Sequence, residues 1–577
     1  MKTSTAVRIG ALASALLLFG TLALYLVLRP TGACACVPEH RASQDRIDAR
    51  AYYDEFESAD DEDGGIWGGL GGRRTAGSQN SAPDSSGAAE SAGPDGQSVP
   101  PATGLPPRPQ PRPGLDDGNV YVDAGTHGFV SPAERPSSTF GLDVDTGSFS
   151  IARTRLETGR RPDPASIRPE EWVNAFTYDD PAPTDKDLGL TTESADLPGS
   201  GQSSLVRVGV TSREVDRSER PPAAVTFLVD TSSSMNIRER LGLAKSSLAL
   251  LAKNLRPTDT ISIVTYSDTA RAVLPPTPVS RTSTILDAID DLESNGSTNL
   301  EDGLDLAYEQ AREGFREGGI NTVVLASDGV ANVGATNPDA LARKIRTAAD
   351  DVNLVSVGFG MGNYNDDLME QLADQGQGFY GYVDTYAEAE RLFVEQLTST
   401  MTVVASDAKA QATFDPEKVE SYRLVGYENR ALADEDFSDA SVDACEIGSG
   451  HQVTALYEVR LADGVEDGSV IGKMSARWKT GRYGDGKAGR SAETSTELEA
   501  PTSGTRPSYD LRLTSLTARF AQALKSAGTG EQPALAELQR EADRLAEGGA
   551  HQAEELAAMI GQARSAQPVT EEPMPLH

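Results

Sequence analysis

Short apolar runs alternate with amphipathic segments through the middle of the chain, and this alternation limits the folds that the chain can adopt. Five apolar runs of strand length begin near residues 223, 260, 322, 354 and 378, and a segment with the apolar spacing of a helix follows each of them. Nearly continuous apolar runs are typical of strands buried on both faces, and helices between them are the usual crossovers of parallel strands. The pattern therefore predicts an α/β domain with a doubly wound parallel sheet, extending from residue 222 to residue 402.

Three loops of this domain carry side chains that suit a hard cation. They hold Asp230, Ser232, Ser234, Thr298 and Asp328. Ligands of doubly wound sheets bind at the carboxyl ends of the strands, and hard cations such as Mg²⁺ prefer oxygen ligands in near-octahedral geometry. Five such ligands leave one coordination position for a carboxylate of a partner protein. The alternative is that the serines cap the next helix and Asp328 shapes a turn, but a cap accounts for one loop and not for three.

The spacing Asp230-x-Ser232-x-Ser234, with Thr298 and Asp328 further along, resembles the metal-ion-dependent adhesion site of von Willebrand factor type A domains. Every position of that motif has its matching residue here. The resemblance implies that the two serines and the threonine ligate a divalent cation, while the two aspartates act directly or through water. It implies Mg²⁺, with Mn²⁺ or Ca²⁺ as alternatives, and a partner protein that presents Asp or Glu. Selectivity would come from side chains around the site, for which the candidates are Met235, Asn236, Asn295 and Asn332.

The regions on either side of this domain have a different pattern. Short alternating runs separated by polar turns favour a β-sandwich over residues 403–500. A run of the same kind, residues 205–210, precedes the α/β domain within a connector that ends at residue 221. Because doubly wound domains can have neighbouring termini, we expect the α/β domain to be inserted into the sandwich.

The flanking regions also resemble a known group of proteins. Residues 138–148 and 172–176 are similar to the N-terminal flanking domain of a group of bacterial envelope proteins with a von Willebrand factor type A domain. Residues 426–430 and 450–458 are similar to the C-terminal domain of that group. The resemblance assigns residues 137–204 to an N-terminal flanking domain. The role of the group is poorly defined, so the resemblance implies a binding mode and not a pathway.

The N-terminal region carries a candidate membrane segment. Residues 9–28 are apolar, follow Lys2 and Arg8, and are long enough to span a bilayer core of about 30 Å. Residues 1–34 are therefore either an uncleaved membrane anchor or a lipoprotein signal with Cys34 as the attachment site. Both alternatives place the body of the protein in the cell envelope, outside the cytoplasm.

Residues 35–136 are rich in glycine, proline, serine and acidic residues. Such a segment buries too little apolar area to fold by itself, so we expect a disordered linker. Tyr52, Tyr53 and Phe56 lie among acidic residues within it. This stretch is either part of the spacer or an acidic-aromatic docking peptide. At the other end, residues 501–577 carry two amphipathic helical stretches, which we expect to pack on their own domain and not in a coiled coil with a partner.

Two further motifs have a structural and a functional interpretation. Residues 143–148 superficially suggest a calcium loop, but the later carboxylates of such a loop are missing, which favours a strand end and a turn. Gly358, Gly360 and Gly362 follow an expected strand but lack the last glycine of a dinucleotide motif, which favours a tight turn between strand and helix.

Composition and motifs favour a binding protein over a nucleic-acid-binding protein or an enzyme. The formal net charge is −35, whereas nucleic-acid binding depends on basic patches. The five histidines fall in no catalytic motif, and Cys445 is an expected lone thiol. We expect an adhesion or protein-binding module that is not an enzyme, of an oligomeric state that the sequence leaves open. The alternatives are a structural envelope protein with a stabilising cation and a metal-dependent hydrolase.

Overall fold

All residues that the computed structural model describes lie within one compact unit, Ala49–His577. The described residues are 49–54, 112–113, 120–121, 123, 125–142, 145–196, 203–216, 220–329, 341, 343–345, 352–360, 366–396, 402–439, 445–480, 489–526 and 531–567. The candidate membrane segment, residues 9–28, and Cys34 lie outside this set. Within the set, no helix has both the length and the apolar character needed to cross a membrane.

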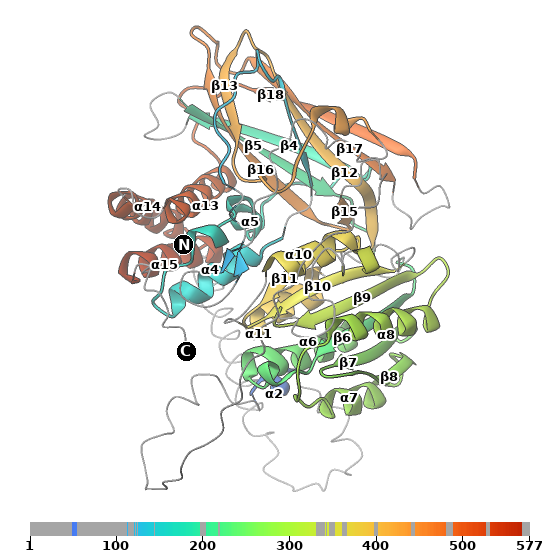
Figure 1. Cartoon of the computed structure of the whole chain (residues 1–577). Helices are drawn as coiled ribbons and strands as arrows, with labels where there is room; N and C mark the ends of the chain where they lie inside the picture. The colour runs from blue at the N-terminus through green and yellow to red at the C-terminus, as the bar shows by residue number, and fades with distance from the viewer. Residues whose placement is uncertain are drawn as a thin grey trace, which may run out of the picture. The chain divides into compact units, whose positions relative to one another are not determined.

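The central domain is built on a six-stranded sheet with the order β11-β10-β9-β6-β7-β8, which can be followed in Figure 1. Its strands are β6 (Ala223–Asp230), β7 (Thr260–Tyr266), β8 (Ala270–Pro278), β9 (Ile320–Ser327), β10 (Asn353–Phe359) and β11 (Tyr380–Val383). All neighbouring pairs are parallel except β7 and β8. The prediction of a doubly wound parallel sheet is therefore confirmed. The sequence did not predict β8, because its three prolines argue against a strand, although prolines are tolerated on an edge strand such as this one.

Helices between the strands cover the sheet. They are α6 (Leu243–Asn254), α7 (Thr282–Asp290), α8 (Leu300–Glu313), α10 (Asp366–Gln375) and α11 (Tyr386–Glu390). The helix α8 packs directly on β6, β7 and β9. Its close approach needs Gly303, because a Cβ at that position would lie 2.9 Å from the ring of Tyr266. Two helices are extended by π-helical turns: η3 (Arg238–Gly242) precedes α6, and η4 (Arg391–Gln396) follows α11.

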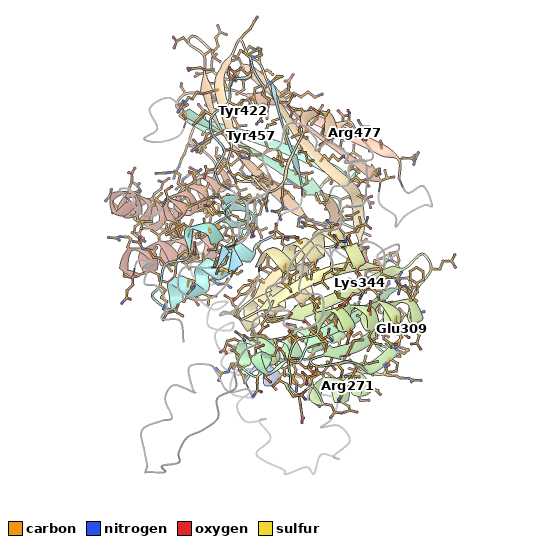
Figure 2. The ribbon with its side chains drawn as sticks, viewed as in Figure 1. Arg271, Glu309, Lys344, Tyr422, Tyr457 and Arg477 are labelled. Atoms are coloured by element: carbon orange, nitrogen blue, oxygen red, sulfur yellow. The ribbon has the colours of Figure 1, made fainter. Side chains whose placement is uncertain are left out.

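Two antiparallel sheets form the sandwich. One has the order β14-β3-β12-β17-β18 with β15 paired to β12, and the other has the order β13-β16-β5-β4. Their strands are β3 (Ser137–Gly141), β4 (Leu188–Asp196), β5 (Ser203–Ser212), β12 (Val403–Phe414), β13 (Val419–Leu424), β14 (Ala431–Leu432), β15 (Cys445–Gly448), β16 (Gln452–Leu461), β17 (Val470–Thr480) and β18 (Ser491–Glu499). Aliphatic and aromatic side chains form the core of the sandwich. Figure 2 labels two of the aromatic ones, Tyr422 and Tyr457, whose ring centroids lie 6.3 Å apart.

The central domain is inserted into this sandwich, as the sequence predicts. The strand β5 precedes the domain, and β16 follows it by about fifty residues along the chain. The two strands nevertheless pair in antiparallel register over nine residues, from Ser203 opposite Arg460 to Thr211 opposite Gln452. The chain therefore leaves the sandwich after β5 and returns to it at β12.

Residues 137–204 do not form a separate layer. The strand β3 lies in one sheet of the sandwich and β4 in the other. The helices α4 (Gly147–Glu157) and α5 (Pro169–Asn174) instead share a core with the C-terminal helices α13 (Tyr509–Lys525), α14 (Glu531–Ala546) and α15 (His551–Ser565). In that core the rings of Trp172 and Phe520 meet edge to face at 5.3 Å. The amphipathic helices of the C-terminal region thus pack on their own chain, as expected. The described residues of this region form three such helices, whereas the sequence indicated two.

Parts of residues 35–136 are ordered, which corrects the prediction that the whole segment is a disordered linker. It contains α2 (Ala49–Asp54), β1 (Arg112–Pro113) and β2 (Val120–Tyr121). Val130 also exchanges two backbone hydrogen bonds, of 2.8 and 2.9 Å, with Tyr422 of the sandwich. The amino-acid composition of a segment indicates only whether the segment can bury a hydrophobic core of its own. These pieces are ordered because they pack on surfaces that the rest of the chain provides.

Candidate metal centre

The sheet order explains how the predicted site residues come together. The neighbouring parallel strands β6 and β9 end at the same edge of the sheet, with Val229 opposite Ala326. Asp230 is the last residue of β6, and Asp328 directly follows β9. Because parallel strands present their carboxyl ends on one side, both carboxylates lie on that side.

Hydrogen bonds join the loop that contains Thr298 to the loop that follows β6. The backbone N–H of Ser233 donates to the carbonyl of Gly296 at 3.1 Å, and that of Asn295 donates to the carbonyl of Thr231 at 2.7 Å. These bonds hold the loop that contains Thr298 against the loop that follows β6. Within the latter loop, the hydroxyls of Ser232 and Ser234 lie 3.0 Å apart. The structure therefore brings the five predicted residues to one place.

The polar atoms at this place fit a hard cation. Thr298 Oγ1 and Asp328 Oδ1 are buried and have no hydrogen-bond partner among the residues that the structure describes. A buried polar atom without a partner costs about 1–3 kcal/mol, so two at one site indicate a ligand that both can face. Ser234 is exposed, which leaves the site open to solvent on one side. No cluster of three or more His, Cys, Asp or Glu side chains suited to a metal occurs in the described ranges. The candidate site has two carboxylates, and its other three oxygen donors are hydroxyls.

The negative charges of the two buried carboxylates are unfavourable at this site. Asp230 is fully buried. Burial first, and the nearby charge of Asp328 second, raise the pKa of Asp230 to about 6. Hydrogen bonds act in the opposite direction: Ser327 Oγ donates to Asp230 Oδ2 at 2.8 Å, and the Ser232 N–H donates to Asp230 Oδ1 at 2.8 Å. Two buried carboxylates this close together need positive charge beside them.

Part of that charge comes from Arg240, which sequence reasoning missed. Its Nη1 donates to Asp328 Oδ2 at 2.9 Å and to the carbonyl of Ser234 at 2.7 Å. Arg240 lies in the π-helical turn η3, where the helical spacing of 3.6 residues per turn does not apply, so the sequence pattern does not show which way its side chain points. Ser327 was also missed, because it lies inside the apolar run of β9.

The candidates for selectivity are only partly supported. Met235 is fully buried, so its side chain is not available to contact a partner. Asn236 and Asn295 are exposed beside the site, while Asn332 lies outside the described residues. Asp268 is a further exposed neighbour: its Oδ1 accepts hydrogen bonds from the backbone N–H and the hydroxyl of Ser297, which lower its pKa.

Comparison with known proteins gives three family matches along the chain. Residues 224–396 match the model of the von Willebrand factor type A domain. Residues 399–565 match the model described as "Uncharacterized protein YfbK, C-terminal", and residues 116–207 match a model described as "von Willebrand factor". The first match covers all six strands of the sheet apart from Ala223 and includes all five site residues.

Among curated relatives, the uncharacterized protein YfbK of Escherichia coli is 41% identical over 338 residues, which is 57% of this chain and 59% of that protein. The uncharacterized protein sll0103 of Synechocystis is 28% identical over 222 residues, or 38% of this chain and 51% of that protein. The chain thus spans between half and three fifths of the length of these relatives. Among solved structures, the von Willebrand factor type A protein from Catenulispora acidiphila is 16% identical with a TM-score of 0.40, covering 63% of this chain and 88% of that one.

Proposed function

The chain belongs to the proteins with a von Willebrand factor type A domain, and we propose on this basis that its central domain binds a divalent cation and, through it, an acidic side chain of a partner protein. The observation that carries the proposal is the convergence of five oxygen-bearing side chains in which two buried oxygen atoms have no partner among the described residues. Neither helix capping nor turn formation accounts for both of these atoms.

In this proposal Ser232, Ser234 and Thr298 hold the cation, and Asp230 and Asp328 balance its charge. Mg²⁺ fits the oxygen donors, with Mn²⁺ and Ca²⁺ as alternatives. A bound cation supplies the positive charge that lets a carboxylate approach a site that already holds two carboxylates. The exposure of Ser234 supports access from solvent. The formal net charge of −35 adds to the argument, because such a chain repels acidic partners unless local charge is reversed.

We further propose that the protein works in the cell envelope, tethered to a membrane and with its body outside the cytoplasm. The support is the apolar segment of residues 9–28 behind two basic residues. We also propose that the site binds and does not catalyse. A hydrolase would need a general base beside the cation, whereas the hydroxyls, carboxylates and guanidinium at this site are accounted for by binding.

The test compares two neighbouring serines. Ser234→Ala removes a proposed ligand, whereas Ser233→Ala removes an exposed hydroxyl of the same loop that donates to the Gly296 carbonyl at 3.1 Å. Titration of the full chain with Mn²⁺ by calorimetry should show about tenfold or greater loss of affinity for Ser234→Ala and little change for Ser233→Ala. Equal affinities in the two variants would contradict the proposed ligand set.

Partner binding is tested with the same variants. The full chain is immobilised and exposed to cell-envelope extract, either with Mg²⁺ or with excess chelator. We expect proteins that are retained by the wild type and by Ser233→Ala with Mg²⁺ and are lost with chelator or with Ser234→Ala. If the same proteins are retained in the presence of chelator, the proposal is contradicted. A large cation-dependent rise in melting temperature without any cation-dependent retention would instead favour the structural alternative.

A further inference from the structure

Arg240 connects two of the three loops that form the candidate metal centre. A single nitrogen of its guanidinium, Nη1, donates to the Ser234 carbonyl at 2.7 Å and to Asp328 Oδ2 at 2.9 Å. The arginine side chain is 10% exposed and that of Asp328 is 1% exposed. Hydrogen bonds between charged groups in such a buried setting are stronger than neutral ones. The contact therefore fixes the position of Asp328 relative to the loop that carries the two serines.

The backbone around Arg240 forms a π-helical turn, η3, close to the loop that carries the two serines. In the turn η3, the backbone N–H of Gly242 donates to the carbonyl of Ile237, five residues earlier, at 3.4 Å. That spacing inserts one residue beyond a regular helical turn, and such π-helical turns frequently occur at functional sites. The turn lies only a few residues after Ser234, so the extra residue directs Arg240 back toward the loop.

Gly360 leaves space for the side chain of Arg240. Gly360 directly follows β10 and has a φ of +73°. A Cβ at Gly360 would lie 2.5 Å from Cγ and 2.9 Å from Nε of Arg240. Gly360, which the sequence places in an expected tight turn, thus also leaves space for the Arg240 side chain. Two independent features, the π-helical turn and the glycine, favour the same placement.

The charges at the site then have a definite sum. Asp230 and Asp328 contribute two negative charges and Arg240 one positive charge. A divalent cation brings the total to one positive charge, and the carboxylate of a ligand brings it to zero. Without Arg240 the site with its cation would be neutral, and its preference for an anionic ligand over an uncharged oxygen ligand would be weaker. Asp268 does not change this sum greatly, because it is exposed and solvent screens its charge.

We propose that Arg240 is a specificity-determining residue of this site, whose positive charge makes the cation-loaded site selective for carboxylate ligands. This inference rests on the proposed function. It assigns the selectivity to a residue of this chain as well as to the cation.

The experiment uses the full chain loaded with Mn²⁺ and two short blocked peptides, acetyl-Gly-Glu-Gly-amide and acetyl-Gly-Gln-Gly-amide. Paramagnetic broadening of the peptide side-chain NMR signals reports binding at the cation. We compare the wild type with Arg240→Met, which keeps the stem but removes the charge, and with Arg240→Lys, which keeps the charge. Arg238→Met, in the same turn, is the control. Calorimetric titration with Mn²⁺ is performed on each variant.

In the wild type and in Arg238→Met, we expect the Glu peptide to be broadened at least tenfold more than the Gln peptide. Arg240→Met should bind Mn²⁺ at least as tightly as the wild type, because a repelling charge is removed, but its preference for Glu should fall about tenfold. Arg240→Lys should recover part of that preference. These results would support the inference.

Two outcomes would overturn it. In the first, Arg240→Met binds Mn²⁺ and keeps the full preference for Glu, which would show that the charge of Arg240 does not select the ligand. In the second, Arg240→Met loses Mn²⁺ affinity as strongly as Ser234→Ala, which would show that Arg240 only maintains the loop structure. Failure of the proposed function itself looks different. In that case the wild type does not bind Mn²⁺, or it does not distinguish the two peptides.

Discussion

Asp230 and Arg240 illustrate what the sequence reveals at the scale of single residues. Asp230 could be identified because it ends an apolar strand, and the end of a parallel strand has a known direction. Arg240 could not be identified, because its contact with Asp328 depends on a π-helical turn and on the space left by Gly360. Met235 was misassigned for a similar reason: its neighbours in sequence are exposed, but its own side chain is fully buried. Residue types and spacing therefore predict which polar side chains meet at this edge of the sheet better than they predict the residues that orient those side chains.

The raised pKa of Asp230 leads to a prediction about pH. A folded-state pKa of about 6, above the ordinary value of 3.8, favours the protonated carboxyl. Its contribution to stability is complete below pH about 4 and is lost as the pH rises through 6. A divalent cation pairs with the ionised form, so the difference in melting temperature between Mg²⁺ and chelator should widen from pH 5 to pH 7.5. In Asp230→Asn this dependence on pH should be much weaker, and a difference that is constant with pH in the wild type would contradict the assignment.

At the scale of elements, α2 shows how a segment can be ordered without a core of its own. The helix packs against α6 and η3. The rings of Tyr53 and Tyr386 lie 6.5 Å apart, and the guanidinium of Arg238 lies 5.5 Å from the Tyr53 ring. Partial burial raises the pKa of Tyr53. Of the two interpretations of this acidic-aromatic stretch, the structure favours docking, with the same chain as the receptor. Sequence alone could not identify the receptor, because the contact joins residues more than 180 positions apart.

Truncation of the docked ring tests this contact. We expect Tyr53→Ala to release α2, because the loss of an aromatic pair and of a cation–π contact costs about 1–2 kcal/mol. Hydrogen exchange of the full chain should become faster in residues 49–54 and around Tyr386, with little change in the sandwich. Asp54→Ala is the matched control, since Asp54 is exposed and its pair with Arg50 at 3.6 Å contributes little. Unchanged exchange in Tyr53→Ala would mean that the ring does not hold the helix.

At the scale of the whole molecule, buried charges join the inserted domain to both flanking regions. Arg430, between β13 and β14, binds Asp145 at 2.7 Å and Glu370 of α10 at 3.6 Å. Arg168 binds Glu370 at 3.1 Å, and Asp145 Oδ1 also accepts the backbone N–H of Tyr380 at 3.1 Å. Asp145, in the segment that superficially suggested a calcium loop, therefore has a carboxylate that joins three parts of the chain. The sequence predicted the insertion from the strand patterns, but ion pairs between distant segments leave no pattern in either segment.

Removal of Arg430 should weaken the whole assembly. Arg430→Met removes the arginine that pairs at 2.7 Å with the Asp145 carboxylate, which is 1% exposed. Breaking a buried pair in this way costs about 3–5 kcal/mol, so the first unfolding transition of the full chain in urea should move to a clearly lower concentration. Asp145→Asn combined with Arg430→Met should cost less than the sum of the two single changes, because the residues are coupled. Lys418→Met is the control, since its pair with Asp415 is more than a third exposed on both sides and contributes at most about 1 kcal/mol. If Arg430→Met unfolds at the same urea concentration as Lys418→Met, the buried pairs do not hold the inserted domain to its flanks.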